Sequence, residues 1–188
     1  MKFILRLSLF TLLLSLGFSS AWADKYSETR TMFEKAGASN MFETAYGYAI
    51  FPTIGKAGFI VGGAYGEGRV YEQGSYIGDT TMAQATIGFQ LGGSGFSQVI
   101  FFQNDRALFM FTNGNFEFGA EAQAVVLTAA AGAAANTVGS SATASGGKNN
   151  ASTAGNGYYK GMATFTITKG GLMYEASIGG QKFSFTKR

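Results

Sequence analysis

Residues 48 to 71 read YAIFPTIGKAGFIVGGAYGEGRVY, an apolar, glycine-rich stretch that holds the single proline of the chain. Glycine in a flat strand loses side-chain packing and backbone entropy, so this density of glycine favours a sheet that bends sharply or backbones that approach closely. Proline has no N–H to donate to a sheet, which places Pro52 in a turn between strands at 46–51 and from Ala57 onward. Lys56 is then predicted at the tip of a rigid turn.

Other segments alternate apolar and polar residues with the period of a half-buried strand, namely 115–126, 158–168 and 182–186. Two apolar runs, 99–102 and 107–111, flank a short polar segment and predict a hairpin. Together these patterns predict a mainly β (α+β) fold: a compact, glycine-rich antiparallel core, barrel-like or a sandwich, with a short N-terminal helix.

Residues 1–23 have the features of a secretory signal peptide: a basic start, a mostly apolar run over 7–18, and small residues at 21–23 (AWA). A membrane anchor would need roughly 20 apolar residues, more than this run supplies. We therefore expect cleavage before Asp24, a single domain over 24–188, and a periplasmic or outer-membrane-associated protein.

The counts of charged residues argue against a nucleic-acid partner. The chain has 14 Lys and Arg against 11 Asp and Glu, and two of the basic residues lie in the predicted signal. No basic cluster is present, whereas nucleic-acid binding requires a cationic surface. The chain also has no cysteine, so it forms no disulfide and is not a lipoprotein anchored through an N-terminal cysteine.

The residue types also argue against catalysis. The chain has no histidine, which removes the usual general base near neutral pH and the commonest metal ligand. Glu117 and Glu121 share one face of a predicted strand, but four residues of strand separate them by about 13 Å. Cooperating glycosidase carboxylates lie roughly 5 to 9.5 Å apart. We therefore expect no enzyme, no metal and no cofactor.

Residues 24–36 (DKYSETRTMFEKA) predict a weakly amphipathic helix that ends at Gly37. Such a helix could lie on a lipid surface, with Lys25, Arg30 and Lys35 near the headgroups. Alternatively, it could cover an open end of the domain. The acidic residues of the helix balance its cations, which favours the second role.

Four segments, in order along the chain, resemble the signature of the SYLF domain family, which occurs in bacterial exported proteins and in eukaryotic lipid- and actin-binding proteins. The segments are 49–69 with its proline, Lys-Ala-Gly-Phe and glycine pattern; 98–111 (QVIFFQNDRALFMF); 114–124 with an alternating strand; and 168–180 (TKGGLMYEASIGG). This chain differs by inserting residues 136–156, whose polar, glycine- and serine-rich composition predicts a flexible surface loop.

The resemblance implies a compact domain that binds membrane lipid, with Lys56 and Lys169 at the positions of the family's basic residues. We therefore expect a non-enzymatic lipid- or membrane-binding envelope protein that presents Lys56 and Lys169 to anionic phospholipids. Actin is not expected as a partner of an exported protein.

Two alternatives remain open at this point. A small eight-stranded outer-membrane β-barrel would also fit an exported, glycine-rich chain with 15% aromatic residues. The other alternative is a periplasmic structural or interaction module whose partner is an envelope protein.

Overall fold

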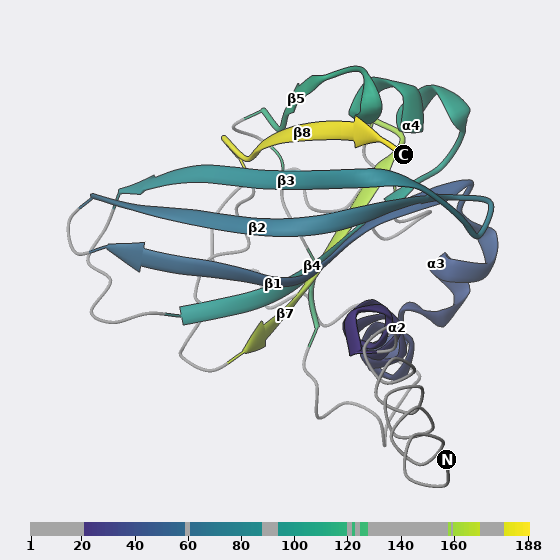
Figure 1. Cartoon of the computed structure of the whole chain (residues 1–188), viewed down its shortest axis with the longest axis horizontal. Coiled ribbons are helices and arrows are strands. Elements are labelled where there is room, and N and C mark those ends of the chain that lie inside the picture. The colour runs from purple at the N-terminus through teal and green to yellow at the C-terminus, as the bar shows by residue number, and fades with distance from the viewer. Residues whose placement is uncertain are drawn as a thin grey trace, which may run out of the picture.

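The computed structural model describes part of the chain, shown in colour in Figure 1. The described residues are 21–58, 61–87, 94–119, 122, 125–127, 158, 160–169 and 179–188. Residues 1–20 and 136–156 lie outside them, so the signal peptide and the flexible loop stay predictions.

The helical elements are α2 (Ala21–Phe33), the π-helical turn η1 (Glu34–Ala38), α3 (Ser39–Thr44) and α4 (Asp105–Thr112). The strands are β1 (Gly47–Gly58), β2 (Val61–Glu72), β3 (Ser75–Ile87), β4 (Ser94–Phe102), β5 (Asn115–Glu117), β6 (Val125–Leu127), β7 (Met162–Lys169) and β8 (Lys182–Lys187).

All the strands belong to one sheet with the order β5-β8-β3-β2-β1-β4-β7-β6. The neighbours pair antiparallel, except β6 and β7, which pair parallel. The sheet curls strongly, with α2 on one side and α4 on the other (Figure 1). The predicted fold class, mainly β with an antiparallel, barrel-like core, is confirmed.

The predicted turn at Pro52 is wrong, because β1 continues through this residue. The register of β1 against β2 shifts between Ile50 and Thr53, which marks a bulge. Proline is tolerated at a bulge because the ladder requires no N–H there. Pro52 is buried, and its carbonyl oxygen accepts a hydrogen bond from Ser97 Oγ at 2.7 Å. Lys56 consequently lies within β1 and not at the tip of a turn.

Two glycines of β2 let this strand approach the side chains of β1 closely. A Cβ placed on Gly66 would lie 2.5 Å from Ile54 Cγ1, and one on Gly68 would lie 2.6 Å from Phe51 Cδ1. Real Cβ atoms do not approach other atoms so closely, so only glycine fits at these positions without a shift of its neighbours. Gly66 and Gly68 therefore leave room for side chains of β1, whereas a close crossing of backbones at glycine stays a prediction.

The predicted hairpin over 99–111 is wrong in its second half. Residues 99–102 belong to β4, but 107–111 lie in helix α4. The strand predicted over 115–126 is also interrupted, because β5 and β6 lie at opposite edges of the sheet. The strand predicted at 182–186 is confirmed as β8. The strand predicted at 158–168 is confirmed as β7 only from Met162 onward, because Lys160 and Gly161 form a turn with positive φ angles.

The N-terminal helix kinks where the sequence predicts its end. Gly37 has a φ of +107°, a left-handed conformation that suits glycine, and α3 follows two residues later. The chain from α2 to α3 covers the outer face of the sheet, where Phe33 is fully buried. The predicted place of this helix, over an open end of the domain, is wrong, because α2 packs on a face of the sheet.

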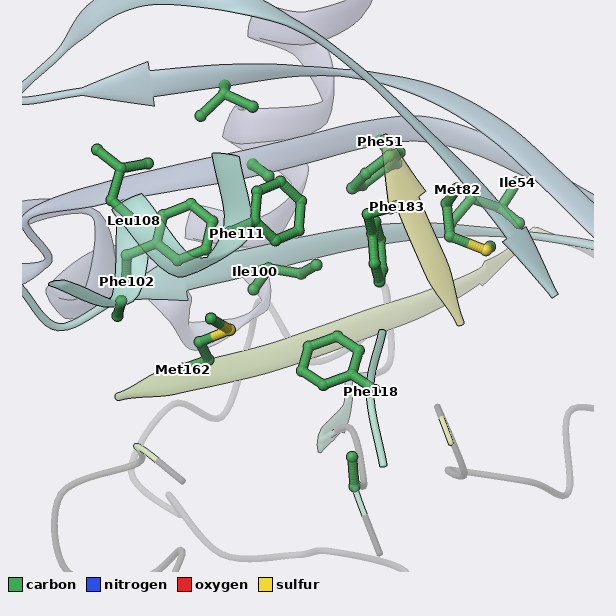
Figure 2. Close-up of a cluster of buried hydrophobic side chains, with 14 of the residues drawn as sticks. Phe51, Ile54, Met82, Ile100, Phe102, Leu108, Phe111, Phe118, Met162 and Phe183 are labelled. Carbon is green, nitrogen blue, oxygen red and sulfur yellow. The ribbon is translucent and has the colours of Figure 1, made fainter. Parts of the chain in front are cut away.

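The main hydrophobic core fills the concave face of the sheet (Figure 2). Phe51 on β1 and Phe183 on β8 have ring centres 5.7 Å apart, although β2 and β3 separate their strands in the sheet. Leu108 and Phe111 of α4 belong to this core and lie beside Phe102 (Figure 2). The curl of the sheet and the position of α4 are thus fixed by the same packing.

Candidate functional site

Helix α4 forms because its first turn is capped and one of its sides is apolar. Asn104 is the N-cap residue, and its Oδ1 accepts a hydrogen bond from the backbone N–H of Ala107 at 3.0 Å. Asp105 in the first turn suits the positive end of the helix dipole. Leu108 and Phe111 are buried, and together with this cap they favour a helix over a strand.

The opposite side of α4 carries an exposed apolar pair. Phe109 is 64% exposed and Met110 is 48% exposed. Among the described residues, Tyr65 is the other large apolar side chain with comparable exposure, at 55%, and it lies on β2, away from α4. Two adjacent, large apolar side chains on one short helix form the most apolar exposed feature in the described part of the chain.

A groove of about 590 Å³ runs beside α4. Its lining comes from α4, β8 and the β2–β3 hairpin. The apolar lining residues are Ile77, Leu108, Phe109 and Phe185, and the polar ones are Glu72, Asp105, Arg106, Thr112 and Lys187. Phe109 therefore belongs both to the exposed pair and to the wall of the groove.

The two acids of the groove are already bonded within the protein. The Tyr46 hydroxyl donates to Glu72 Oε1 at 2.7 Å, and this bond raises the pKa of Tyr46 above its ordinary value. Asp105 Oδ1 accepts from the backbone N–H of Arg106 at 2.7 Å. The side chain of Arg106 is exposed, as is that of Lys187, and neither forms an ion pair with another described residue. The lining of the groove therefore carries two cations and two carboxylates, and no net charge.

The predicted pair Lys56 and Lys169 lies at one end of the sheet, but on opposite faces. Gly55 on β1 and Lys169 on β7 occupy the same row through β4, so they share a face. Lys56 is the next residue, so its side chain points from the opposite face, because the side chains of successive strand residues point to opposite faces of a sheet. There its Nζ lies 5.7 Å from the centre of the Phe96 ring. Lys169 is exposed, and its Nζ donates to Thr53 Oγ1 at 3.1 Å.

The predicted cations of the N-terminal helix differ in how they are engaged within the protein. Arg30 Nε lies 2.8 Å from Glu34 Oε1, and this hydrogen bond raises the pKa of Arg30. The guanidinium also lies 4.9 Å from the centre of the Phe42 ring, so Arg30 is engaged within the protein. Lys25 Nζ lies 5.0 Å from the ring of the residue that follows it, and Lys35 is exposed on η1.

Reasoning from the sequence missed the α4 site because it assigned 107–111 to a buried strand. The available signal was the order Asn104-Asp105 before the apolar run, which is a helix N-terminus pattern. The five consecutive apolar residues 107–111 cannot all face the core when they form a helix, so a helix here implies exposed apolar side chains.

The described residues give no indication of a metal site or of a membrane-spanning helix. No group of three Asp, Glu, Cys or His side chains gathers among them as potential metal ligands. Within the same residues, no helix is both long enough and apolar enough to cross a bilayer.

Comparisons with known proteins leave the family of the chain open. No protein-family model matches the chain, and a search of curated proteins gives no significant match.

Proposed function

We propose that this protein is a non-enzymatic, peripheral membrane-binding protein that contacts anionic phospholipids through α4. The observation that carries the proposal is the exposed pair Phe109 and Met110, next to the cation Arg106. Apolar side chains beside cations suit a membrane interface, where the former insert and the latter meet phosphates. The resemblance of four ordered segments to the SYLF family supports a lipid ligand.

The expected affinity is modest. Full burial of a Phe or Met side chain contributes about 1.5–3 kcal/mol, and the pair is only partly exposed before binding. Each cation near an anionic surface adds about 1 kcal/mol. Arg106 and Lys187 therefore supply a salt-sensitive share, which the neighbouring carboxylates of Asp105 and Glu72 reduce, and the apolar pair supplies a share that salt does not screen.

The test is vesicle flotation of the protein from residue 24 onward. Wild type is expected to float with vesicles that contain phosphatidylglycerol, more weakly at high salt, and least with pure phosphatidylcholine. The double variant Phe109→Ser/Met110→Ser is expected to lose at least tenfold in vesicle affinity. Arg106→Glu should lose several-fold, and only with anionic vesicles.

Tyr65→Ser is the matched control, because it removes an equally exposed aromatic side chain that lies away from α4. It should float like wild type. If Tyr65→Ser and the α4 double variant behave alike, α4 is not the membrane-contact element. If wild type binds no vesicle at low salt, the proposal fails, and a protein partner becomes the better reading of the exposed pair.

The outer-membrane barrel alternative predicts a different result. An integral barrel would resist extraction of cell membranes by alkaline carbonate, whereas a peripheral protein would be released. Retention in the carbonate pellet would therefore contradict the proposal.

A further inference from the structure

We infer that Met110 on α4 is a site of oxidation by peroxide, and that its conversion to the sulfoxide releases the protein from the membrane. The second half of this inference rests on the proposed function, since it adds regulation to the same contact, whereas the first half does not. Oxidation turns the flexible, apolar thioether of methionine into a polar group, and methionine sulfoxide reductases reverse the change. A methionine in a membrane contact therefore suits a switch.

Exposure to solvent distinguishes Met110 from the other described methionines. Met110 is 48% exposed, whereas Met82 is 0% exposed and Met162 is 6% exposed. Met32 and Met41 are partly buried and pack against the hydrophobic cluster on the outer face of the sheet. A peroxide molecule has to reach the sulfur from solvent, so it should react with Met110 first.

The composition of the chain directs this chemistry to methionine. Cysteine and methionine carry the oxidisable sulfur of proteins, and this chain has no cysteine. The predicted export would also place the protein in an oxidising compartment. In the reaction with hydrogen peroxide, the sulfur gives two electrons to the O–O bond and keeps one of the two oxygen atoms. The O–O bond breaks, and the other oxygen leaves with both protons as water.

The position of Met110 makes its oxidation matter for binding. It follows Phe109, which is 64% exposed, and these two side chains form the apolar pair proposed to enter the lipid. A sulfoxide oxygen accepts hydrogen bonds from water, and these bonds would be lost when the side chain enters hydrocarbon. Arg106 keeps its charge, so the oxidised protein should keep the salt-sensitive part of its binding and lose much of the remainder.

The first test measures oxidation without vesicles. The protein from residue 24 onward is treated with dilute hydrogen peroxide at neutral pH, and peptide mass spectrometry follows the addition of one oxygen atom to each methionine. Met110 is expected to react at least tenfold faster than Met82 and Met162, which are matched controls within the same molecule. A rate at Met110 no higher than that at Met82 would overturn the inference, whatever the protein does with lipid.

The second test compares vesicle flotation before and after treatment with peroxide. Wild type is expected to lose at least fivefold in affinity for anionic vesicles, and a methionine sulfoxide reductase should restore the affinity. In Met110→Leu, which has no sulfur at this position, the affinities before and after treatment should agree within about twofold. Met41→Leu is the matched control, because it removes a partly buried methionine from the outer face and should stay as sensitive to peroxide as wild type.

The outcomes separate this inference from the proposed function. If Met110 is oxidised selectively but wild type floats equally well before and after treatment, the switch is overturned and the membrane proposal stands. If Met110→Leu loses affinity on treatment as wild type does, another residue is responsible, and the switch is again overturned. If untreated wild type does not float at low salt, the membrane proposal and the switch both fail, and only the selective oxidation measured in solution remains.

Discussion

Gln98 and Gln181 bond to each other twice, with Gln98 Nε2 donating to Gln181 Oε1 at 2.9 Å and Gln181 Nε2 donating to Gln98 Oε1 at 3.2 Å. Both side chains are almost fully buried. Gln98 lies on β4 and Gln181 directly precedes β8, and three strands separate β4 from β8 in the sheet. The pair therefore bridges the concave side and helps to hold the sheet in its curled form.

Replacing one glutamine of this pair should lower the free energy of unfolding more than replacing both. Gln98→Leu leaves the buried amide of Gln181 with fewer partners, which should lower the free energy of unfolding by about 1–3 kcal/mol. In Gln98→Leu/Gln181→Leu both polar groups are gone, so the double variant should cost less than the sum of the two single variants. Urea denaturation of the four proteins gives the coupling energy, and additive costs would show that the pair does not act as a unit.

Glycines in the β1–β2 hairpin should differ sharply in their tolerance of alanine. A Cβ at Gly68 would meet Phe51 Cδ1 at 2.6 Å and the Ile50 carbonyl oxygen at 2.8 Å, whereas a Cβ at Gly55 would meet nothing within 4 Å. Gly68→Ala should therefore destabilise the protein by about 1–3 kcal/mol, as overpacking does. Gly55→Ala should change stability by no more than about 0.5 kcal/mol. Thermal unfolding of the two variants checks this, and equal losses would contradict the steric explanation.

The sequence predicts the fold class, because strand periodicity and glycine density both reflect the curled sheet directly. The prediction at Pro52 is wrong because a bulge, like a turn, needs no N–H from this residue. Only the pairing of β1 with both of its neighbours distinguishes a bulge from a turn. The prediction at 107–111 is wrong because an apolar run fits a buried strand or a half-buried helix equally well. The α4 site was missed for this reason.

The candidate lysines show the same limit. Lys56 is predicted at the tip of a turn but lies within β1, and the face that its side chain occupies depends on the bulge in this strand. A shift of one residue in register moves a side chain to the other face, and no local pattern marks where the bulge lies.

The opposite faces of Lys56 and Lys169 give a test between the two proposed membrane contacts. If α4 carries the contact, Lys56→Glu and Lys169→Glu should each change vesicle affinity by less than about twofold, because a charge remote from the membrane is largely screened beyond a Debye length. Flotation with anionic vesicles at moderate salt measures this. Loss of binding in Lys56→Glu, with folding intact, would favour the contact predicted from the sequence and contradict α4.

Buried tyrosines should make the protein sensitive to alkaline pH. Burial raises the pKa of Tyr48 above its ordinary value of 10.0, although the nearby Arg30 opposes this shift, and burial also raises the pKa values of Tyr26 and Tyr158. A raised pKa in the folded state means that the unfolded chain loses these protons first as pH rises. The contribution of these protonated tyrosines to the free energy of unfolding is therefore fully present below pH 10. It is lost as the pH rises from 10 through the raised pKa values of the folded state.

Tyr48→Phe isolates one of these groups. Near neutral pH this substitution should change the free energy of unfolding by less than about 1 kcal/mol. The hydroxyl that it removes accepts only one long hydrogen bond, from Arg30 at 3.4 Å. Above pH 10 its free energy of unfolding should fall less steeply than that of wild type, since one fewer proton is lost on unfolding. Urea denaturation at a series of pH values measures both slopes. Identical slopes in the two proteins would show that Tyr48 ionises equally readily in the folded and unfolded states.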